Sequence, residues 1–330
     1  MRRILALLMA LMLLPGCVLA EGNLLVEDVE IIEDPAAQPA EEGAFPPLNE
    51  KGFLDEGEFV YENEEDGVWR YASATLRIEI YRRTQDKPKQ VWYEAEIWAD
   101  DGEAFSLIPV NPDKRFTSQA FPYKLARQSR TVFAINTDFA QLRYNQKIRM
   151  GVIIRDRVVR SEVTWRQGAS KFPNLDVLAL YPDGNMEVYA SDEKTAQEYL
   201  DMGVQSTLAF GPILIRDGEL NSKALKKYGT SSAQRTAIGM VEKGHYFAMM
   251  LEGRLERSKG AGISFLAERM KEKGCTLAFN LDGGQTACMV FMGRQICDID
   301  ERKSNVSSRK TSEILGIGTS EAVRSVDDPW

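Results

Sequence analysis

Short runs in which apolar and polar residues alternate, separated by turn signals, constrain the fold of this chain more than any other feature. Residues 72–82 carry apolar side chains at every second position, and after the polar turn 85–88 the run 91–99 alternates again. A period of two residues sends successive side chains to opposite faces of a strand, so these two runs predict a β-hairpin.

The second half of the chain repeats this pattern around three further turn signals. They are Pro-Asp-Gly-Asn at 182–185, Asp-Gly at 217–218 and Glu-Lys-Gly at 242–244, each next to apolar runs. Helical periodicity is weaker and predicts helices over 123–130, 195–202 and 263–273. We therefore expect an α+β fold with strand-rich mixed sheets, a few inserted helices and an N-terminal hairpin.

The first twenty residues predict an exported protein. Arg2-Arg3 is followed by an apolar run over 4–14, which is typical of a signal peptide and too short to cross a bilayer as a helix. Cleavage after Ala20, a small residue, would release a secreted or extracytoplasmic chain. The alternative is that residues 14–17 act as a lipobox, with acylation at Cys17 as a lipid anchor.

Charge divides the rest of the chain into an acidic segment and a basic body. Residues 21–66 hold sixteen Asp and Glu but a single base, which leaves 67–330 with 38 bases and 33 acids, a net charge of +5. The acidic, proline-containing stretch 21–57 predicts a disordered linker that spaces the body from a membrane or cell wall. The body suits an anionic substrate but is too weakly basic for a nucleic-acid partner.

Cysteine and histidine are too few to predict a metal site. Beyond the signal peptide the chain has Cys275, Cys288 and Cys297, an odd number without metal-like spacing, and one histidine, His245. We expect buried thiols, with one disulfide as the alternative in an exported protein, and no zinc site.

Four segments share one feature: an apolar strand ends abruptly in polar residues or glycine. They are residues 132–139, 208–215, 235–239 and 276–286. In the last, a core strand presents Asp282 just before Gly283 and Gly284. Glycines let backbone N–H groups approach a ligand closely, so this segment predicts an anion-binding nest.

The order of these segments and the identity of their residues resemble the phosphodiester glycosidase family, over roughly residues 131–317. The pieces that carry the resemblance are AINTDF at 134–139, AFGPILIRDG at 209–218, RTAIGM at 235–240, MLEGR at 250–254, SKGAGISF at 258–265 and NLDGGQTACMVFMGRQI at 280–296. The resemblance implies a catalytic part over 131–330, with 58–130 as a strand-rich N-terminal part of the same domain.

The resemblance implies hydrolysis of a sugar-1-phosphodiester at the anomeric C–O bond, giving a free sugar and a phosphomonoester. This reaction needs a carboxylate at an oxocarbenium-like centre and a cationic partner for the phosphate. We expect Asp282 to be nucleophile or general base and Arg235 to hold the phosphate. The other candidates are Asp138 and Glu252 as further catalytic acids, and Asn136, Gly211, Gly283, Gly284 and Thr286 as substrate-binding residues.

Three further expectations follow. Gln285 stands where the family usually has glycine, which narrows the approach to the loop and keeps open the alternative of a non-catalytic glycan-binding or envelope-assembly protein. No cofactor is predicted, although the oxygens of Asp138 or Asp282 would suit Ca²⁺ or Mg²⁺. The substrate is expected to be an envelope or extracellular glycan. If the four strand ends form one active site, Asn136, Arg235 and Asp282 should converge within one pocket.

Overall fold

The computed structural model describes residues 42–139, 150–163, 175–229, 231–298 and 308–328. Residues from Gly43 to Trp330 form one compact unit. Residues 43–57, which the sequence assigns to the linker, belong to this unit, and Phe53 and Leu54 are buried in it. The predicted signal peptide and the rest of the linker up to residue 41 lie outside the described residues.

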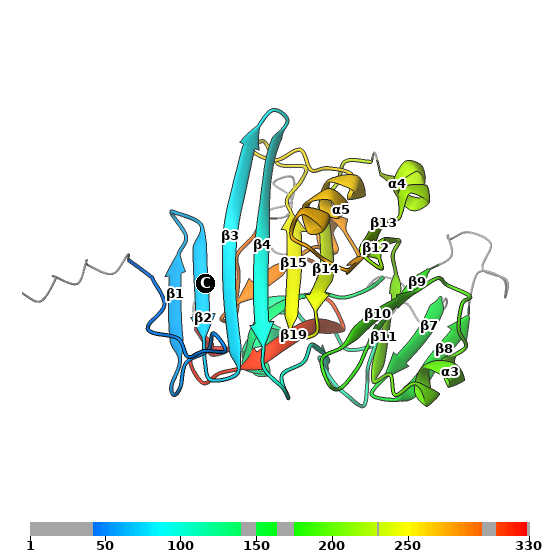
Figure 1. Cartoon of the computed structure of the whole chain (residues 1–330), viewed down its shortest axis with the longest axis horizontal. Coiled ribbons are helices and arrows are strands. Elements are labelled where there is room, and N and C mark those ends of the chain that lie inside the picture. Colours follow the sequence, from blue (N-terminus) through cyan, green and yellow to red (C-terminus); the bar gives the residue numbers. More distant parts are fainter. Residues whose placement is uncertain (1–41, 140–149, 164–174, 230, 299–307, 329–330) are drawn as a thin grey trace, which may run out of the picture. The chain divides into compact units, whose positions relative to one another are not determined.

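A nine-stranded antiparallel sheet dominates the unit (Figure 1). Its order is β1 (Phe59–Asn63), β2 (Val68–Ala72), β3 (Leu76–Asp86), β4 (Lys89–Ala99), β15 (His245–Leu251), β14 (Arg235–Glu242), β16 (Leu277–Asn280), β12 (Ile213–Arg216) and β13 (Glu219–Leu220). The predicted hairpins β3–β4, β12–β13 and β14–β15 are confirmed. Because β4 pairs with β15, the N-terminal strands extend the sheet itself.

The remaining strands form three smaller sheets. Five strands pair in the order β18 (Arg294–Gln295), β17 (Met289–Phe291), β6 (Thr131–Asn136), β19 (Glu313–Thr319) and β5 (Ser106–Pro109). Three pair as β10 (Met186–Tyr189), β9 (Asp176–Leu180) and β11 (Ser206–Phe210), and β7 (Gly151–Arg155) pairs with β8 (Val158–Val163). The predicted hairpin around 182–185 is the β9–β10 pair.

Three of the four helices in the described residues are the predicted ones: α1 (Pro122–Gln128), α3 (Ala196–Asp201) and α5 (Ile263–Glu272). The fourth, α4 (Ser222–Tyr228), has no fully buried residue, and its seven residues are too few for a clear apolar periodicity, so it was not predicted. Asn221 caps it by accepting a hydrogen bond from the Ala224 N–H at 3.2 Å.

The two larger sheets pack face to face with a helix outside each. Ile78 and Ile97 from one sheet share a core with Phe133 and Leu315 from the other. On the far face of the nine-stranded sheet, α5 packs against residues of β12 and β15, while α1 covers the far face of the five-stranded sheet. Each apolar face is therefore covered, as an α+β domain requires.

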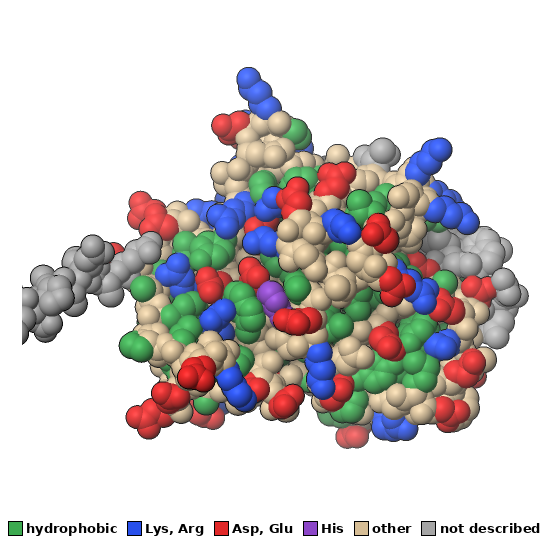
Figure 2. Space-filling view, viewed as in Figure 1, with side chains coloured by type: hydrophobic (Ala, Val, Ile, Leu, Met, Phe, Trp, Pro, Cys, Tyr) green, Lys and Arg blue, Asp and Glu red, His purple; other side chains and the backbone are tan. Residues whose placement is uncertain are grey.

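The described surface is mixed in charge. Acidic and basic side chains are interspersed on the face drawn in Figure 2, so the positive charge of the body forms no continuous basic patch there.

Cys275, Cys288 and Cys297 are buried and unpaired, and burial raises the pKa of Cys275 and Cys288 to about 12. Within the described ranges, no helix has the length and apolarity needed to cross a membrane.

A buried ion cluster joins the smaller sheets. Arg155, fully buried at the end of β7, lies 2.6 Å from the carboxylate of Glu313 on β19 and 3.5 Å from Asp138, just after β6. Asp138 also accepts a hydrogen bond from the Ala209 N–H on β11 at 2.8 Å. Each buried charge therefore has partners on a neighbouring strand.

Glu313→Gln tests the importance of this cluster. It should lower the free energy of unfolding by about 3–5 kcal/mol, because it leaves the Arg155 guanidinium buried beside a single distant carboxylate. Urea unfolding followed by circular dichroism measures the change. The control is Glu321→Gln, in an exposed pair with Arg130, which should cost under about 1 kcal/mol. Equal losses would show that the cluster has no special role.

Candidate active site

The loop from Leu281 to Cys288, here called the crossing loop, carries the chain from β16 in the nine-stranded sheet to β17 in the five-stranded sheet. Asn136, at the end of β6, fixes both ends of this loop. Its side-chain amide donates to the Asp282 carbonyl at 2.8 Å and to the Thr137 carbonyl at 3.1 Å. Its Oδ1 accepts from the Cys288 N–H at 3.0 Å.

This geometry corrects the predicted role of Asn136. The side chain is completely buried, and both of its amide protons are used by backbone carbonyls. It therefore positions the crossing loop instead of holding a sugar hydroxyl.

Asp282 stands on this loop with its side chain half-buried. Its backbone N–H donates to the Thr137 carbonyl at 3.3 Å, and its Oδ1 accepts from the Gly283 N–H at 2.9 Å. Of the three carboxylates that the sequence predicts to be catalytic, Asp282 is the one that is not fully buried.

The two glycines have a steric role rather than the predicted one. The Gly283 N–H bonds Asp282, and the Gly284 N–H donates to the Gln234 carbonyl at 3.1 Å, so both amides are occupied within the protein and form no open anion nest. A Cβ at Gly283 would lie 2.6 Å from the Gln234 oxygen, and Gly284 has a φ of +59°. Gln285, in contrast, has no left-handed backbone, so glycine is not required there. Thr286 is buried, and its hydroxyl has no hydrogen-bond partner among the described residues.

Two arginines lie against the crossing loop. A Cβ built on Gly283 would be 3.7 Å from Cδ of Arg235, and one on Gly284 would be 4.0 Å from a terminal nitrogen of Arg254. Arg235 donates to the Ser231 carbonyl at 2.7 Å, whereas its Nε is buried without a partner. Burial, and then the neighbouring Arg254, lower the pKa of Arg235.

No ion pair with an acidic side chain is found for either arginine within the described part of the chain. Two guanidinium groups beside one loop, neither paired with an acid in these ranges, have the chemistry to bind an anion, because each can donate two hydrogen bonds to one phosphate or carboxylate group. Arg254 was not predicted as a site residue. It stands in the segment MLEGR, which the sequence analysis singled out, but only the glutamate of that segment, Glu252, was assigned a role.

Glu252 and Asp138 have structural roles, which corrects their assignment as catalytic acids. Glu252 is fully buried and lies 2.7 Å from Arg257; it also accepts hydrogen bonds from the Tyr93 hydroxyl at 3.2 Å and the Asp298 N–H at 2.9 Å. These contacts hold the turn that presents Arg254, whose φ is +59°. Asp138 belongs to the buried cluster of Arg155.

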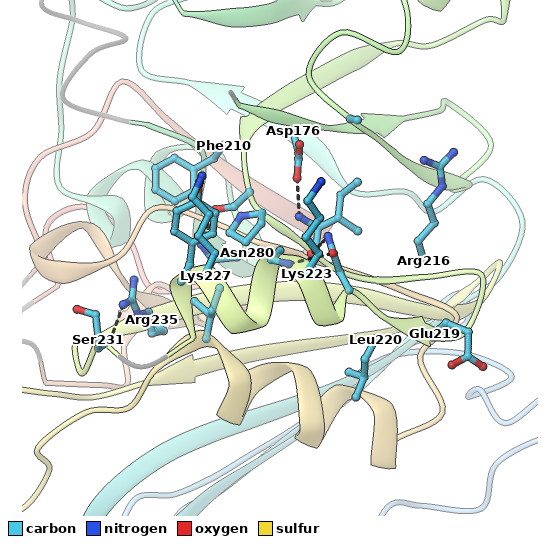
Figure 3. Close-up of a pocket in the computed structure, with 18 residues that line it drawn as sticks. Asp176, Phe210, Arg216, Glu219, Leu220, Lys223, Lys227, Ser231, Arg235 and Asn280 are labelled. Atoms are coloured by element: carbon cyan, nitrogen blue, oxygen red, sulfur yellow. Dashed lines mark hydrogen bonds between the residues drawn. The ribbon is translucent and has the colours of Figure 1, made fainter. Parts of the chain in front are cut away.

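A pocket of about 1140 Å³ opens beside Arg235 (Figure 3). Its wall includes the predicted residues Arg235 and Gly211, together with Asn280, whose side-chain amide donates to the Gly211 carbonyl at 2.8 Å. The Asn280 Oδ1 is buried and has no hydrogen-bond partner among the described residues. The sequence did not predict the contributions of Asp176, Lys223 and Lys227, because β9 and α4 reach this place only through the tertiary fold.

The sequence predicted that Asn136, Arg235 and Asp282 would converge in one pocket, but of the three only Arg235 is among the residues that line the pocket described above. Asn136 bonds the backbone of Asp282, and Arg235 approaches Gly283, the next residue. No group of three or more His, Cys, Asp and Glu side chains in the described ranges is arranged to hold a metal ion.

Asn136→Ala should lower the free energy of unfolding by about 1–3 kcal/mol for each buried group that loses its partner, namely the Asp282 carbonyl and the Cys288 N–H. Denaturant unfolding measures the loss. Asn136→Asp is the companion variant, because it keeps the acceptor for Cys288 but removes both donated bonds. A stability of Asn136→Ala equal to that of the wild type would disprove the loop-positioning role.

The raised pKa of the Asp176 carboxyl predicts that the stability of the protein depends on pH. Burial is the main cause that raises the pKa of its carboxyl, although its Oδ2 accepts from the Ile213 N–H at 2.9 Å. A raised pKa in the folded state means that its contribution to stability is present below 3.8 and is lost as the pH rises through the folded-state pKa. Asp176→Asn should therefore gain stability relative to the wild type as the pH rises from 3 towards neutrality.

Melting temperatures across this pH range test the sign of the Asp176 effect. Asp183→Asn gives a control of opposite sign, because a hydrogen bond from Lys243 lowers the pKa of Asp183. If both variants shift in the same direction, the burial argument for Asp176 is wrong.

Comparison with known proteins gives the same family as the sequence segments. The family model described as phosphodiester glycosidase matches residues 129–318, more than half of the chain. A similar curated protein is the SPbeta prophage-derived uncharacterized protein YomE of Bacillus subtilis strain 168, with 27% identity over 236 residues. That match covers 69% of this chain and 35% of the relative, so the chain spans about a third of the relative's length.

A solved structure shows the same fold. It is the catalytic domain of zebrafish N-acetylglucosamine-1-phosphodiester alpha-N-acetylglucosaminidase, auto-inhibited by pro-peptide, with a TM-score of 0.57 and 17% identity. The similarity covers 79% of this chain and 87% of that domain. On the match of the family model, with its characteristic segments gathered around the crossing loop, the chain belongs to the phosphodiester glycosidase family.

Proposed function

We propose that this protein is an exported hydrolase that cleaves a sugar-1-phosphodiester at the anomeric C–O bond of an envelope or extracellular glycan. The products would be a free sugar and a phosphomonoester. Membership of the phosphodiester glycosidase family supports a hydrolase of this type. The observation that carries the proposal is the half-buried carboxylate of Asp282 on a loop flanked by two arginines that form no ion pair with any acid in the described ranges.

The chemistry needs only one carboxylate close to the sugar. A phosphomonoester is a good leaving group, so departure from the anomeric carbon depends little on a general acid. Asp282 can then act on the anomeric centre as nucleophile, or as general base towards a water molecule. In the second case water adds to the carbon, the C–O bond breaks, and the water proton passes to Asp282.

Arg235 and Arg254 supply the charge stabilisation. When the C–O bond breaks, the phosphate changes from a monoanionic diester to a more highly charged monoester. Guanidinium groups already in place therefore bind the transition state more strongly than the substrate. The Nε of Arg235 is buried and has no hydrogen-bond partner among the described residues, so this arginine keeps donor capacity that the fold does not use.

The proposed setting comes from the N-terminus. The predicted signal peptide supports export, and the acidic stretch that follows supports a position near a membrane or cell wall. Glycans in such a setting can carry sugar-phosphate linkages, which matches the substrate class.

Release of free sugar from a panel of glycosyl-1-phosphodiesters tests the proposal. Asp282→Asn should lower kcat by about 10²–10⁴-fold while calorimetry still detects substrate binding, because the amide keeps the shape but cannot accept a proton or attack carbon. Asp217→Asn, at an exposed turn, is the matched control and should retain activity.

Two results would overturn parts of this proposal. Binding of the panel by the wild type without any turnover would refute hydrolysis and favour a glycan-binding protein on the same fold. Full activity of Asp282→Asn would leave the function standing but refute the assignment of the carboxylate.

A further inference from the structure

The pocket beside Arg235 continues well beyond the space that one phosphate needs. It has a volume of about 1140 Å³, and its wall runs from Arg235 and Asn280 to the helix α4. Asp282 is not one of the residues that line it, whereas Arg235 is. Arg235 also approaches the crossing loop at Gly283, the residue after Asp282, so it joins the loop to the pocket in the spatial order Asp282, Arg235, pocket.

This order matches the order of groups in the proposed substrate. If the anomeric carbon lies at Asp282 and the phosphate at Arg235, the group beyond the phosphate, the aglycone, points into the pocket. The Oδ1 of Asn280, which has no hydrogen-bond partner in the part of the chain that the structure describes, can accept a hydrogen bond from a hydroxyl of that group. The rings of Phe210 and Tyr228 supply apolar surface in the same wall.

Two lysines of α4 give the pocket a positive charge that the reacting phosphate does not use. Lys223 and Lys227 are four residues apart and so lie on one side of the helix. Figure 3 shows both side chains extending from α4 on the side of Phe210 and Asp176. Neither has an ion pair in the described part of the chain, whereas Arg216 in the same wall lies 2.7 Å from Glu193.

We propose that this pocket binds an aglycone that carries a second anionic group, held by Lys223 and Lys227, so that the substrate is a glycosyl phosphodiester with at least two negative charges. This inference depends on the proposed function for the position of the reacting phosphate at Arg235. The wall also holds the carboxylates of Asp176 and Glu219, but neither forms an ion pair with Lys223 or Lys227 among the described residues: Asp176 accepts a hydrogen bond from the Ile213 N–H, and Glu219 lies 3.9 Å from Lys271.

Calorimetry with two small probes tests the second anion site without any need for turnover. Propyl phosphate offers one anionic group, and 1,3-propanediol bisphosphate offers two. The wild type should bind the bisphosphate about tenfold more tightly at low ionic strength, as expected for two partly exposed ion pairs. High salt should reduce this preference.

The double variant Lys223→Gln/Lys227→Gln should lose the preference and keep its affinity for propyl phosphate. The control Lys124→Gln/Lys226→Gln removes the same charge from exposed positions outside the pocket wall, and it should keep the preference. Equal binding of the two probes by the wild type, or equal effects of the two double variants, would overturn the inference.

Measuring the turnover of two substrates distinguishes a failure of this inference from a failure of the proposed function. Two glycosyl-1-phosphodiesters that differ only in a propyl or a 3-phosphopropyl aglycone should show a lower KM for the second, and only in proteins that keep both lysines. Hydrolysis of both with equal KM would refute the second anion site and leave the function standing. Bisphosphate preference without hydrolysis of either compound would refute the function and leave the anion site standing.

Discussion

The hydrogen bonds made by the side-chain amide of Asn136 are the interactions on which the candidate active site depends. The two large sheets are connected here by the crossing loop, and Asn136 reaches from one sheet to hold both the Asp282 carbonyl and the Cys288 N–H. Without these bonds, two polar groups of the loop would be buried without partners. The position of the Asp282 carboxylate is therefore set by the packing of one sheet on the other.

The arginines discussed above fall into two groups, those that pair with buried carboxylates and those that have no acidic partner among the described residues. Arg155 and Arg257 are matched by the buried carboxylates Glu313 and Glu252, which hold strands and turns together. Arg235 and Arg254 lack such partners within the described residues, and burial lowers the pKa of Arg235. An arginine that the fold leaves unmatched is available for an anion from outside.

The sequence predicted the elements better than the directions of the side chains. Hairpins and three helices followed from periodicity and turn residues, and the position of Asp282 followed from a core strand that ends in Asp-Gly-Gly. The same reasoning failed for Asn136, Asp138 and Glu252, because a polar residue at a strand end can face solvent or a buried partner contributed by a distant strand. The helix α4 was missed for a related reason: tertiary contacts bring it to the site, and no local pattern marks it. Arg254 was missed although it stands in the segment MLEGR, because only the glutamate of that segment was assigned a role.

The absence of fully buried residues in α4 has a consequence for how this protein can diverge. Positions that do not support the core can change without a large cost in stability, because surface substitutions usually alter it by about 0.5 kcal/mol or less. The lysines of α4 can therefore be exchanged through evolution while the loop fixed by Asn136 stays constant. Under the proposed function, preference for the leaving group and the chemistry at the sugar can thus evolve separately on one scaffold.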